Sequence, residues 1–224
     1  MTTASRTSAI KIVLCGPSNA GKTSITKRFI TDTFDEFQDT TVGSAFFSKQ
    51  LYSKAHNTSV RVEVWDTAGQ EKYRAMAPMY FRHAAGALLV FDETSVDSFR
   101  ELETVWLPEL LPFMNNSTEF IVVCGNKCDA VVNDDQRESV RQAQEVCRMK
   151  GMTFFDTSAK KGQNVHESFQ GLVDSILSKR EKEAAEGAAE ENSANGRGKG
   201  VNTRRLGNDI NNNNSGDSAK GGCC

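Results

Sequence analysis

Residues 16–23 carry the pattern Gly-x-x-x-x-Gly-Lys-Thr, whose residue types and spacing suit phosphate binding. An apolar run, Ile10–Cys15, precedes the pattern, and a segment that reads as a helix start follows it. Glycines let the backbone approach phosphate oxygens, and the N–H groups at a helix N-terminus favour negative charge. Lys22 is expected to reach the β- and γ-phosphates, and the Thr23 hydroxyl to ligate Mg²⁺. The predicted phosphate contacts are Ser18, Asn19, Ala20, Gly21, Lys22, Thr23 and Ser24.

A second pattern, Asp66-x-x-Gly69, also follows an apolar segment and is succeeded by Gln70. We expect Asp66 to hold the magnesium shell through a water molecule. The Gly69 N–H can reach the γ-phosphate, and the Gln70 amide can orient a water for in-line attack. Alone, such a pattern is often a surface turn. Downstream of a phosphate loop it indicates that Lys22, Gly69 and Gln70 form a catalytic group.

Two further segments have the chemistry of a base reader. In Asn126-Lys127-Cys128-Asp129, the Asp129 carboxylate can accept from the N1–H and exocyclic amine of guanine, which adenine lacks. Asn126 can engage the opposite edge of the base, and the Lys127 stem can cover its face. The Ala159 N–H can bind the guanine carbonyl. The residues predicted to contact the base are Asn126, Lys127, Asp129, Ser158, Ala159 and Lys160.

Either base segment alone is more often a charged turn after a strand, but their order behind the phosphate loop favours guanine over adenine. Between the first helix and the second strand lies Thr40-Thr41-Val42-Gly43. A threonine hydroxyl here can close over the γ-phosphate and magnesium. An ordinary β-strand threonine is an equally good interpretation from residue chemistry alone.

Strand-like and helical segments alternate from Ile10 to about Arg180, which predicts an α/β fold. The fold is expected to be a doubly wound, mostly parallel six-stranded sheet flanked by helices, with ligand at the carboxyl ends of the strands. The polar segment Ser53–Ser59 predicts a hairpin turn. The six predicted strands are Ile10–Cys15, Ser44–Leu51, Val60–Trp65, Ala87–Phe91, Phe120–Cys124 and Thr153–Phe155.

The chain is predicted to have three parts: a flexible arm at residues 1–9, a nucleotide-binding domain at residues 10–180, and a tail at residues 181–224. The Ala/Glu-rich segment Glu181–Glu191 is expected to extend the last helix, and the residues after Asn192 to be disordered. One helical segment, Phe99–Phe113, contains Pro108 and Pro112. Because proline removes a helix hydrogen bond, this helix is predicted to end or kink near Leu107.

Composition limits the functional classes. The chain has 224 residues, of which 38% are hydrophobic and 25% charged, and its formal net charge is −2. This charge gives no argument for nucleic-acid binding. The polar start, Met1–Ser8, does not read as a signal peptide, and no apolar stretch is long enough to span a bilayer. Cys15 and Cys124 lie in apolar runs and read as core residues of a protein in a reducing compartment.

These motifs together resemble the Rab proteins of the Ras superfamily of small GTPases. The resemblance covers about Ile10–Arg180, and the segments Glu36–Phe46 and Ala77–Arg82 are most similar to the early-endosomal branch. It implies that Thr41 is a magnesium ligand and that Phe34 packs against guanine. It also implies that three aromatic residues face effector proteins: Phe46, Trp65 and Tyr80.

The resemblance implies a GTP-hydrolysing switch that cycles between GTP and GDP on the cytoplasmic face of endosomal membranes. Its partners would be an exchange factor, a GTPase-activating protein, a GDP-dissociation inhibitor, a prenylation escort protein and effectors. It further implies that Cys223 and Cys224 carry two prenyl groups, although a free thiol pair is the alternative. Ser18 and Asn19 depart from the two glycines of Ras, and activity is expected to survive this change.

Rival interpretations remain open. The chain could be a metabolic kinase or ATPase with a phosphate loop, although the pair Asn126 and Asp129 argues against adenine. It could be a scaffold that binds GTP without hydrolysing it, although an intact Gln70 argues against that. It could also be a Ras-like switch on another secretory or endocytic membrane.

Overall fold

The computed structural model describes residues 9–195 of the 224. The chain divides into two compact units, Met1–Glu183 and Ala184–Cys224. Residues 1–8 of the predicted arm and most of the predicted tail, including Cys223 and Cys224, lie outside the described residues, so those expectations stay predictions. Ala9, the last residue of the predicted arm, is instead the first residue of a strand. The first unit holds the sheet and every candidate site residue that the structure describes.

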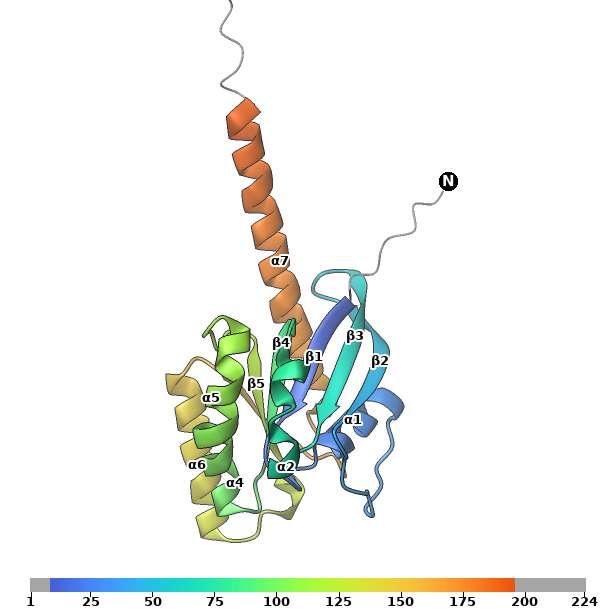
Figure 1. Cartoon of the computed structure of the whole chain (residues 1–224), viewed down its shortest axis with the longest axis vertical. Coiled ribbons are helices and arrows are strands. Elements are labelled where there is room, and N and C mark those ends of the chain that lie inside the picture. The colour runs from blue at the N-terminus through green and yellow to red at the C-terminus, as the bar shows by residue number, and fades with distance from the viewer. Residues whose placement is uncertain (1–8, 196–224) are drawn as a thin grey trace, which may run out of the picture. The chain divides into compact units, whose positions relative to one another are not determined.

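A six-stranded sheet forms the centre of the first unit, with strand order β2-β3-β1-β4-β5-β6 (Figure 1). Only the β2–β3 pair is antiparallel, so the predicted doubly wound, mostly parallel sheet is confirmed. The predicted hairpin joins β2 to β3, with Ser53 opposite Thr58. The strands are β1 Ala9–Cys15, β2 Ser44–Ser53, β3 Thr58–Thr67, β4 Gly86–Asp92, β5 Ile121–Asn126 and β6 Thr153–Asp156.

Burial of the strands follows their residue patterns. β4 and β5 are apolar along nearly their whole length and are buried on both faces, as parallel strands between helices are. β3 alternates: Val60, Val62 and Val64 are buried, whereas Arg61 is exposed and Glu63 half-buried. One face of β3 therefore contributes to the core while the other reaches solvent.

Helices cover both faces of the sheet. On one face, α1 contributes Ile25 and Phe29, and Phe29 stacks on Phe169 of α7 with ring centroids 3.8 Å apart. On the other face, α3, α4, α5 and α6 pack through residues such as Phe81 and Leu110. The helices are α1 Lys22–Thr31, α2 Glu71–Arg74, α3 Ala77–Phe81, α4 Val96–Glu101, α5 Leu107–Leu110, α6 Asp134–Met149 and α7 Val165–Asn195.

The helix predicted to end or kink near Leu107 continues past that residue. A π-helical turn, η1 Leu102–Trp106, joins α4 to α5, and a 3₁₀ turn, η2 Leu111–Met114, follows. Pro108 lies in the first turn of α5, where a missing N–H is tolerated. The wider π turn therefore accommodates the proline by changing the hydrogen-bond pattern, and the helical path ends only at Met114. A further 3₁₀ turn, η3 Cys128–Ala130, follows β5.

The last helix, α7, contains the expected Ala/Glu-rich extension and runs to Asn195, a few residues beyond the predicted onset of disorder. Its residues 184–195 form the described part of the second unit. Among the described helices, none combines the length and the apolar character needed to cross a bilayer.

Candidate functional site

A cavity of about 510 Å³ opens at the carboxyl ends of the parallel strands, where the predicted motifs meet. Its walls come from the phosphate loop, the loop between α1 and β2, and the loops after β3, β5 and β6. The predicted site residues in the lining are Ser18, Asn19, Gly21, Lys22, Thr23, Ser24, Phe34, Thr41, Gly69, Asn126, Lys127, Asp129, Ala159 and Lys160. The predicted residues outside the lining are Ala20, Asp66, Gln70 and Ser158.

The phosphate loop wraps closely around Lys22. Its ammonium donates to the carbonyl oxygens of Gly16 and Pro17, at 2.8 and 2.7 Å. A Cβ on Gly69 would lie 2.5 Å from the Lys22 Nζ and 2.6 Å from the Pro17 carbonyl oxygen, so only glycine fits there. Gly21, immediately before α1, lies in the left-handed region at φ 88°, which glycine adopts without strain. The loop therefore leaves room for a ligand's oxygens rather than for its own side chains.

Burial changes the electrostatics of Lys22. The side chain is almost fully buried, and burial lowers the pKa of Lys22 to about 8, while the neighbouring Asp66 carboxylate opposes the shift. An ammonium that is poorly solvated gains most from an anionic ligand, because the ligand replaces the lost hydration. Lys22 is thus prepared for a phosphate group.

Three oxygen-bearing side chains converge where the magnesium ion was predicted. The Thr23 Oγ1 lies 2.7 Å from the Thr41 Oγ1 and donates to the Asp66 Oδ2 at 2.6 Å. Asp66 is fully buried, and its Oδ1 has no hydrogen-bond partner. Burial raises the pKa of Asp66 to about 6, although the hydrogen bond from Thr23 opposes the shift. Hard oxygen ligands with an unsatisfied carboxylate oxygen fit a Mg²⁺ ion, which would remove the cost of this buried charge.

The Asn126 side chain makes structural hydrogen bonds that the sequence analysis did not predict. Its side chain is almost fully buried and donates from Nδ2 to the Ala20 carbonyl oxygen at 2.9 Å. Its Oδ1 accepts from the Ala159 N–H at 3.1 Å. Asn126 thus links the phosphate loop, β5 and the loop after β6. The Asn126 side chain and the Ala159 N–H, both predicted to contact the base, are hydrogen-bonded to each other instead.

Asp129 is held in place by Ser158. The Ser158 hydroxyl donates to the Asp129 Oδ1 at 2.5 Å, while Ser158 itself is fully buried. The Asp129 carboxylate lines the cavity, and its second oxygen makes no side-chain hydrogen bond within residues 9–195. Lys127 pairs with Asp92 at 2.6 Å, which lays its stem along the cavity. These contacts fix the Asp129 carboxylate and the Lys127 stem, the two groups predicted from the sequence to contact the base.

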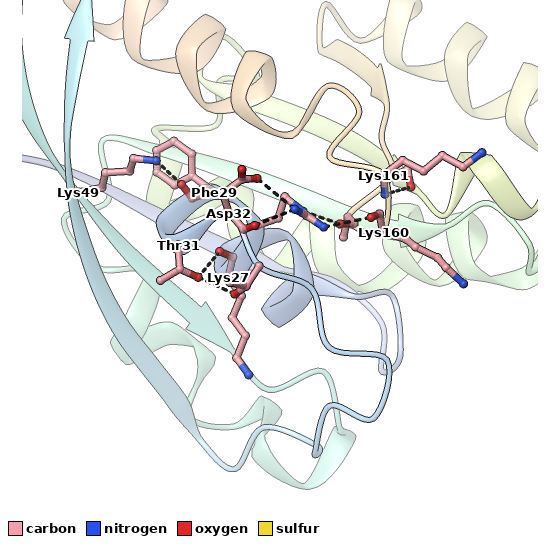
Figure 2. Close-up of polar contacts among 11 residues, drawn as sticks. Lys27, Phe29, Thr31, Asp32, Lys49, Lys160 and Lys161 are labelled. Carbon is pink, nitrogen blue, oxygen red and sulfur yellow. Dashed lines mark hydrogen bonds and ion pairs between the residues drawn. The ribbon is translucent and has the colours of Figure 1, made fainter.

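Arg28 supports the site and was missed by the sequence analysis. From the last turn of α1, its guanidinium donates to the Ala159 and Lys160 carbonyl oxygens, at 2.8 and 3.0 Å, and it also pairs with Asp32. Figure 2 shows Asp32 and Lys160 on the two sides of this contact. Arg28 therefore fixes the loop after β6 against α1. The only sequence signal was a basic residue in the last turn of a helix.

The loop between α1 and β2 adds further lining residues without a predicted role. They are Asp35, Glu36, Gln38, Asp39 and Thr40, together with Thr67 and Ala130 from other segments. Glu36 reaches across the cavity mouth to Lys160, at 3.4 Å. No spacing rule could have placed them, because the loop has no regular structure.

Gln70 and the three aromatic residues are not part of the cavity lining. Gln70 precedes the first turn of α2 in extended conformation, next to Gly69. The rings of Phe46 and Trp65 meet edge-on with centroids 5.4 Å apart, and those of Trp65 and Tyr80 are 6.1 Å apart. The structure thus brings together the aromatic group that the resemblance implied.

Comparison with known proteins agrees with this geometry. The model of the Ras family matches residues 11–178. GTP-binding protein YPT53 of Saccharomyces cerevisiae is 38% identical, over 78% of this chain and 80% of its own length. Ras-related protein RABF2b of Arabidopsis thaliana is 42% identical, over 73% and 78%. Ras-related protein Rab5 of Nicotiana tabacum is 40% identical, over the same shares. The chain therefore belongs to the Ras family, in the branch that includes the Rab5-type proteins.

Proposed function

We propose that this protein is a GTP-hydrolysing switch that regulates endocytic membrane traffic at early endosomes. The observation that carries the proposal is one cavity that joins the phosphate loop to the Asp129 carboxylate, whose Oδ1 is held by the Ser158 hydroxyl. Membership of the Ras family, whose relatives include GTP-binding proteins, supports the same activity.

At the phosphate end, Lys22 and the backbone N–H groups of the loop would bind the β- and γ-phosphates. The lysine would exchange its two carbonyl partners for phosphate oxygens when the ligand arrives. Thr23 and Thr41 would hold Mg²⁺ directly and Asp66 through water; the ion supplies charge neutralisation between the phosphates. The Thr41 hydroxyl then senses the γ-phosphate, which makes its loop depend on the nucleotide state.

At the base end, Asp129 would accept from the guanine N1–H and amine, with Ser158 fixing its orientation. The methylenes of Lys127 would cover one face of the ring and Phe34 the edge nearer solvent. Adenine offers an acceptor where guanine offers N1–H, so it would leave the carboxylate unpaired and is rejected.

Hydrolysis would require Gln70 to orient a water molecule in line with the γ-phosphate, with Gly69 donating its N–H. Among the described residues that line the cavity there is no arginine, and Arg74 pairs instead with Glu109 at 3.4 Å. Intrinsic hydrolysis would therefore be slow. A GTPase-activating partner would add an arginine worth about 10³–10⁵-fold in rate.

We place the active form on the cytoplasmic face of endosomal membranes, held by prenyl groups on Cys223 and Cys224. Two prenyl chains give stable membrane anchoring, whereas a single lipid chain binds the membrane reversibly. A prenylation escort protein would deliver the chain, a GDP-dissociation inhibitor would extract its GDP form, and an exchange factor would reload it. Effectors would read the aromatic group Phe46, Trp65 and Tyr80, of which Phe46 is half-exposed.

The test is nucleotide competition followed by single-turnover hydrolysis on the full chain. GDP and GTP should displace a fluorescent guanine nucleotide at least a thousandfold better than ADP and ATP, about 4 kcal/mol of discrimination. Bound GTP should then convert to GDP and phosphate. Equal competition by ATP would overturn the base assignment, and GTP that stays intact with an activating partner present would overturn the enzyme assignment.

A further inference from the structure

The Arg28 guanidinium uses each of its three nitrogen atoms to bind a backbone carbonyl group. Its Nε donates to the Ala159 carbonyl oxygen at 2.8 Å, and one terminal nitrogen donates to the Lys160 carbonyl oxygen at 3.0 Å. The other terminal nitrogen donates to the Asp32 carbonyl oxygen at 2.9 Å and to the Asp32 Oδ1 at 3.1 Å, and Figure 2 shows the contact between Asp32 and Lys160. The Arg28 side chain is 17% exposed, so these bonds are partly shielded from water, which strengthens a charged donor.

The bond from Arg28 to Ala159 is one link in a closed path around α1. The Ala159 N–H donates to the Asn126 Oδ1 at 3.1 Å, and the Asn126 Nδ2 donates to the Ala20 carbonyl oxygen at 2.9 Å. Ala20 lies in the phosphate loop, just before α1 begins at Lys22. The path therefore starts in the last turn of α1, passes through both segments predicted to contact the base, and returns to the phosphate loop ahead of the same helix.

Arg28 also holds the start of the loop between α1 and β2. The Asp32 N–H donates to the Arg28 carbonyl oxygen at 3.1 Å, while the guanidinium holds the Asp32 carbonyl oxygen. Phe34, the residue expected to pack against guanine, follows shortly after and lines the cavity. A second link between the two loops, the pair of Glu36 and Lys160, joins side chains that are both more than half exposed, and such pairs contribute little. Arg28 is thus the stronger connection between the two loops.

Other residues secure the packing of α1. Ile25 and Phe29 belong to the core, and the Phe29 ring stacks on Phe169 with centroids 3.8 Å apart. Lys49 also donates to the Phe29 carbonyl oxygen at 2.5 Å, a contact drawn in Figure 2. Loss of the Arg28 guanidinium should therefore leave the helix in place and free the loop after β6. Because Arg28 is not part of the cavity lining, its loss removes no direct contact with a ligand.

We propose that Arg28 is a positioning residue that sets the lifetime of the bound guanine nucleotide, by holding the loop of Ala159 at the base end of the cavity. It acts through Ala159 and slows opening of the loop, so it affects dissociation of the nucleotide more than association. Lysine replaces it only in part, since one ammonium cannot match the planar fork that reaches several carbonyl groups. The inference rests on the proposed guanine-nucleotide function and adds a residue that controls nucleotide release.

The experiment measures dissociation of a fluorescent GDP from the full chain, in excess Mg²⁺ and unlabelled GDP. Arg28→Gln loses both the charge and the fork, and it should release GDP about 10- to 100-fold faster than wild type. Arg28→Lys should give a rate between the two, and it carries the test if Arg28→Gln does not fold. Hydrolysis of bound GTP, stimulated by an activating partner, should be unchanged, because Arg28 contacts neither Gln70 nor the phosphate loop.

Asp32→Asn is the matched control. It removes the ion pair at the end of α1 but keeps the two bonds from Arg28 to the loop after β6. Asparagine also tolerates the left-handed backbone at this position, where φ is 57°. The Asp32 side chain is 88% exposed, and exposed ion pairs contribute little, so the release rate should stay within about twofold of wild type.

A second nucleotide separates positioning from a general loss of structure. The diphosphate of 2-aminopurine riboside has no carbonyl group for the Ala159 N–H to bind, so it should gain little from a fixed loop. Arg28→Gln should therefore accelerate release of this nucleotide much less than release of GDP. A general loosening of the fold would instead accelerate both equally.

Three results would overturn the inference. They are wild-type release of GDP from the Arg28 variants, equal acceleration for the two nucleotides, and an acceleration in Asp32→Asn as large as in Arg28→Gln. A wild-type protein that does not bind GDP would instead overturn the proposed function, which keeps the two failures distinct.

Discussion

The hydroxyl oxygens of Thr23 and Thr41 lie 2.7 Å apart, although they belong to different segments of the chain. Thr23 lies in the first turn of α1 and is held by a regular helix, whereas Thr41 lies in the irregular loop before β2. A hydroxyl pair this close is an arrangement that a shared cation can stabilise, since each oxygen offers a lone pair. Closing of the loop and binding of the metal are therefore expected to depend on each other.

Thr23→Asn should weaken binding of GTP with Mg²⁺ more than binding of GDP. The change removes an oxygen that contacts Thr41 and Asp66 at once, and hydrogen bonds to charged groups contribute about 1.5–3 kcal/mol. The expected loss in GTP affinity is about 10- to 100-fold, measured by titration with and without Mg²⁺. Thr31→Asn is the matched control, because the Thr31 hydroxyl bonds the Lys27 carbonyl oxygen away from the cavity. Equal losses for both nucleotides would contradict the metal assignment.

Asp129→Asn should shift preference from guanine toward xanthine. Asparagine replaces one acceptor oxygen with a donor, and xanthine offers a carbonyl where guanine has its amine. The bond from Ser158 survives, since the remaining oxygen can accept it. Competition between GTP and XTP measures the shift, with Asp134→Asn at the exposed start of α6 as control. A variant that still prefers GTP over XTP as strongly as wild type would refute base reading by Asp129.

Much of the fold was predictable because its signals are local. All six predicted strands are present within two residues or so at each end, since apolar runs and alternation survive any tertiary arrangement. The phosphate loop was equally clear, because its glycines act within eight residues. The helix around Pro108 does not end near Leu107, one of the two predicted alternatives; a π turn precedes the proline instead, and its Leu102 and Trp106 are buried in the core.

The missed parts of the site depend on strand order, which no local pattern contains. Arg28 reaches the loop after β6 only because α1 and that loop meet at one edge of the sheet. Glu93 is buried because its carboxyl group lies against Gly125 of the neighbouring strand β5, where any side chain would clash with it. A lone glutamate after a strand carries no sequence signal of burial.

Gln70→Leu should keep nucleotide affinity but nearly abolish hydrolysis. Only the amide that orients the water is lost, and Gln70 lies outside the cavity lining, so binding contacts remain. The measurement is single-turnover GTP hydrolysis with and without an activating partner, with Gln142→Leu on α6 as the control. A wild-type stimulated rate in Gln70→Leu would rule out this role.

Replacing Cys223 and Cys224 together by serine should move the protein from the membrane to the soluble fraction of cells. GTP hydrolysis in vitro should be unchanged, because both residues lie outside the nucleotide-binding domain. A single replacement should leave weaker attachment, since each buried CH₂ contributes about 0.8 kcal/mol and one chain alone binds reversibly. Fractionation of cell lysates is the measurement. Wild-type membrane content in the double variant would require a protein receptor instead of a lipid anchor.

Glu93 should also make the folding stability depend on pH. Its pKa is raised from 4.5 to about 9 in the folded protein, so the folded state keeps a proton that the unfolded chain releases between these values. The associated stability is complete below about pH 4.5 and is lost as the pH rises toward 9. The free energy of unfolding should fall by up to about 1.4 kcal/mol per pH unit from this group alone. Urea unfolding at several pH values should give a flatter profile for Glu93→Gln and greater stability than wild type at pH 8. Parallel profiles for the two proteins would mean that Glu93 is already ionised at neutral pH.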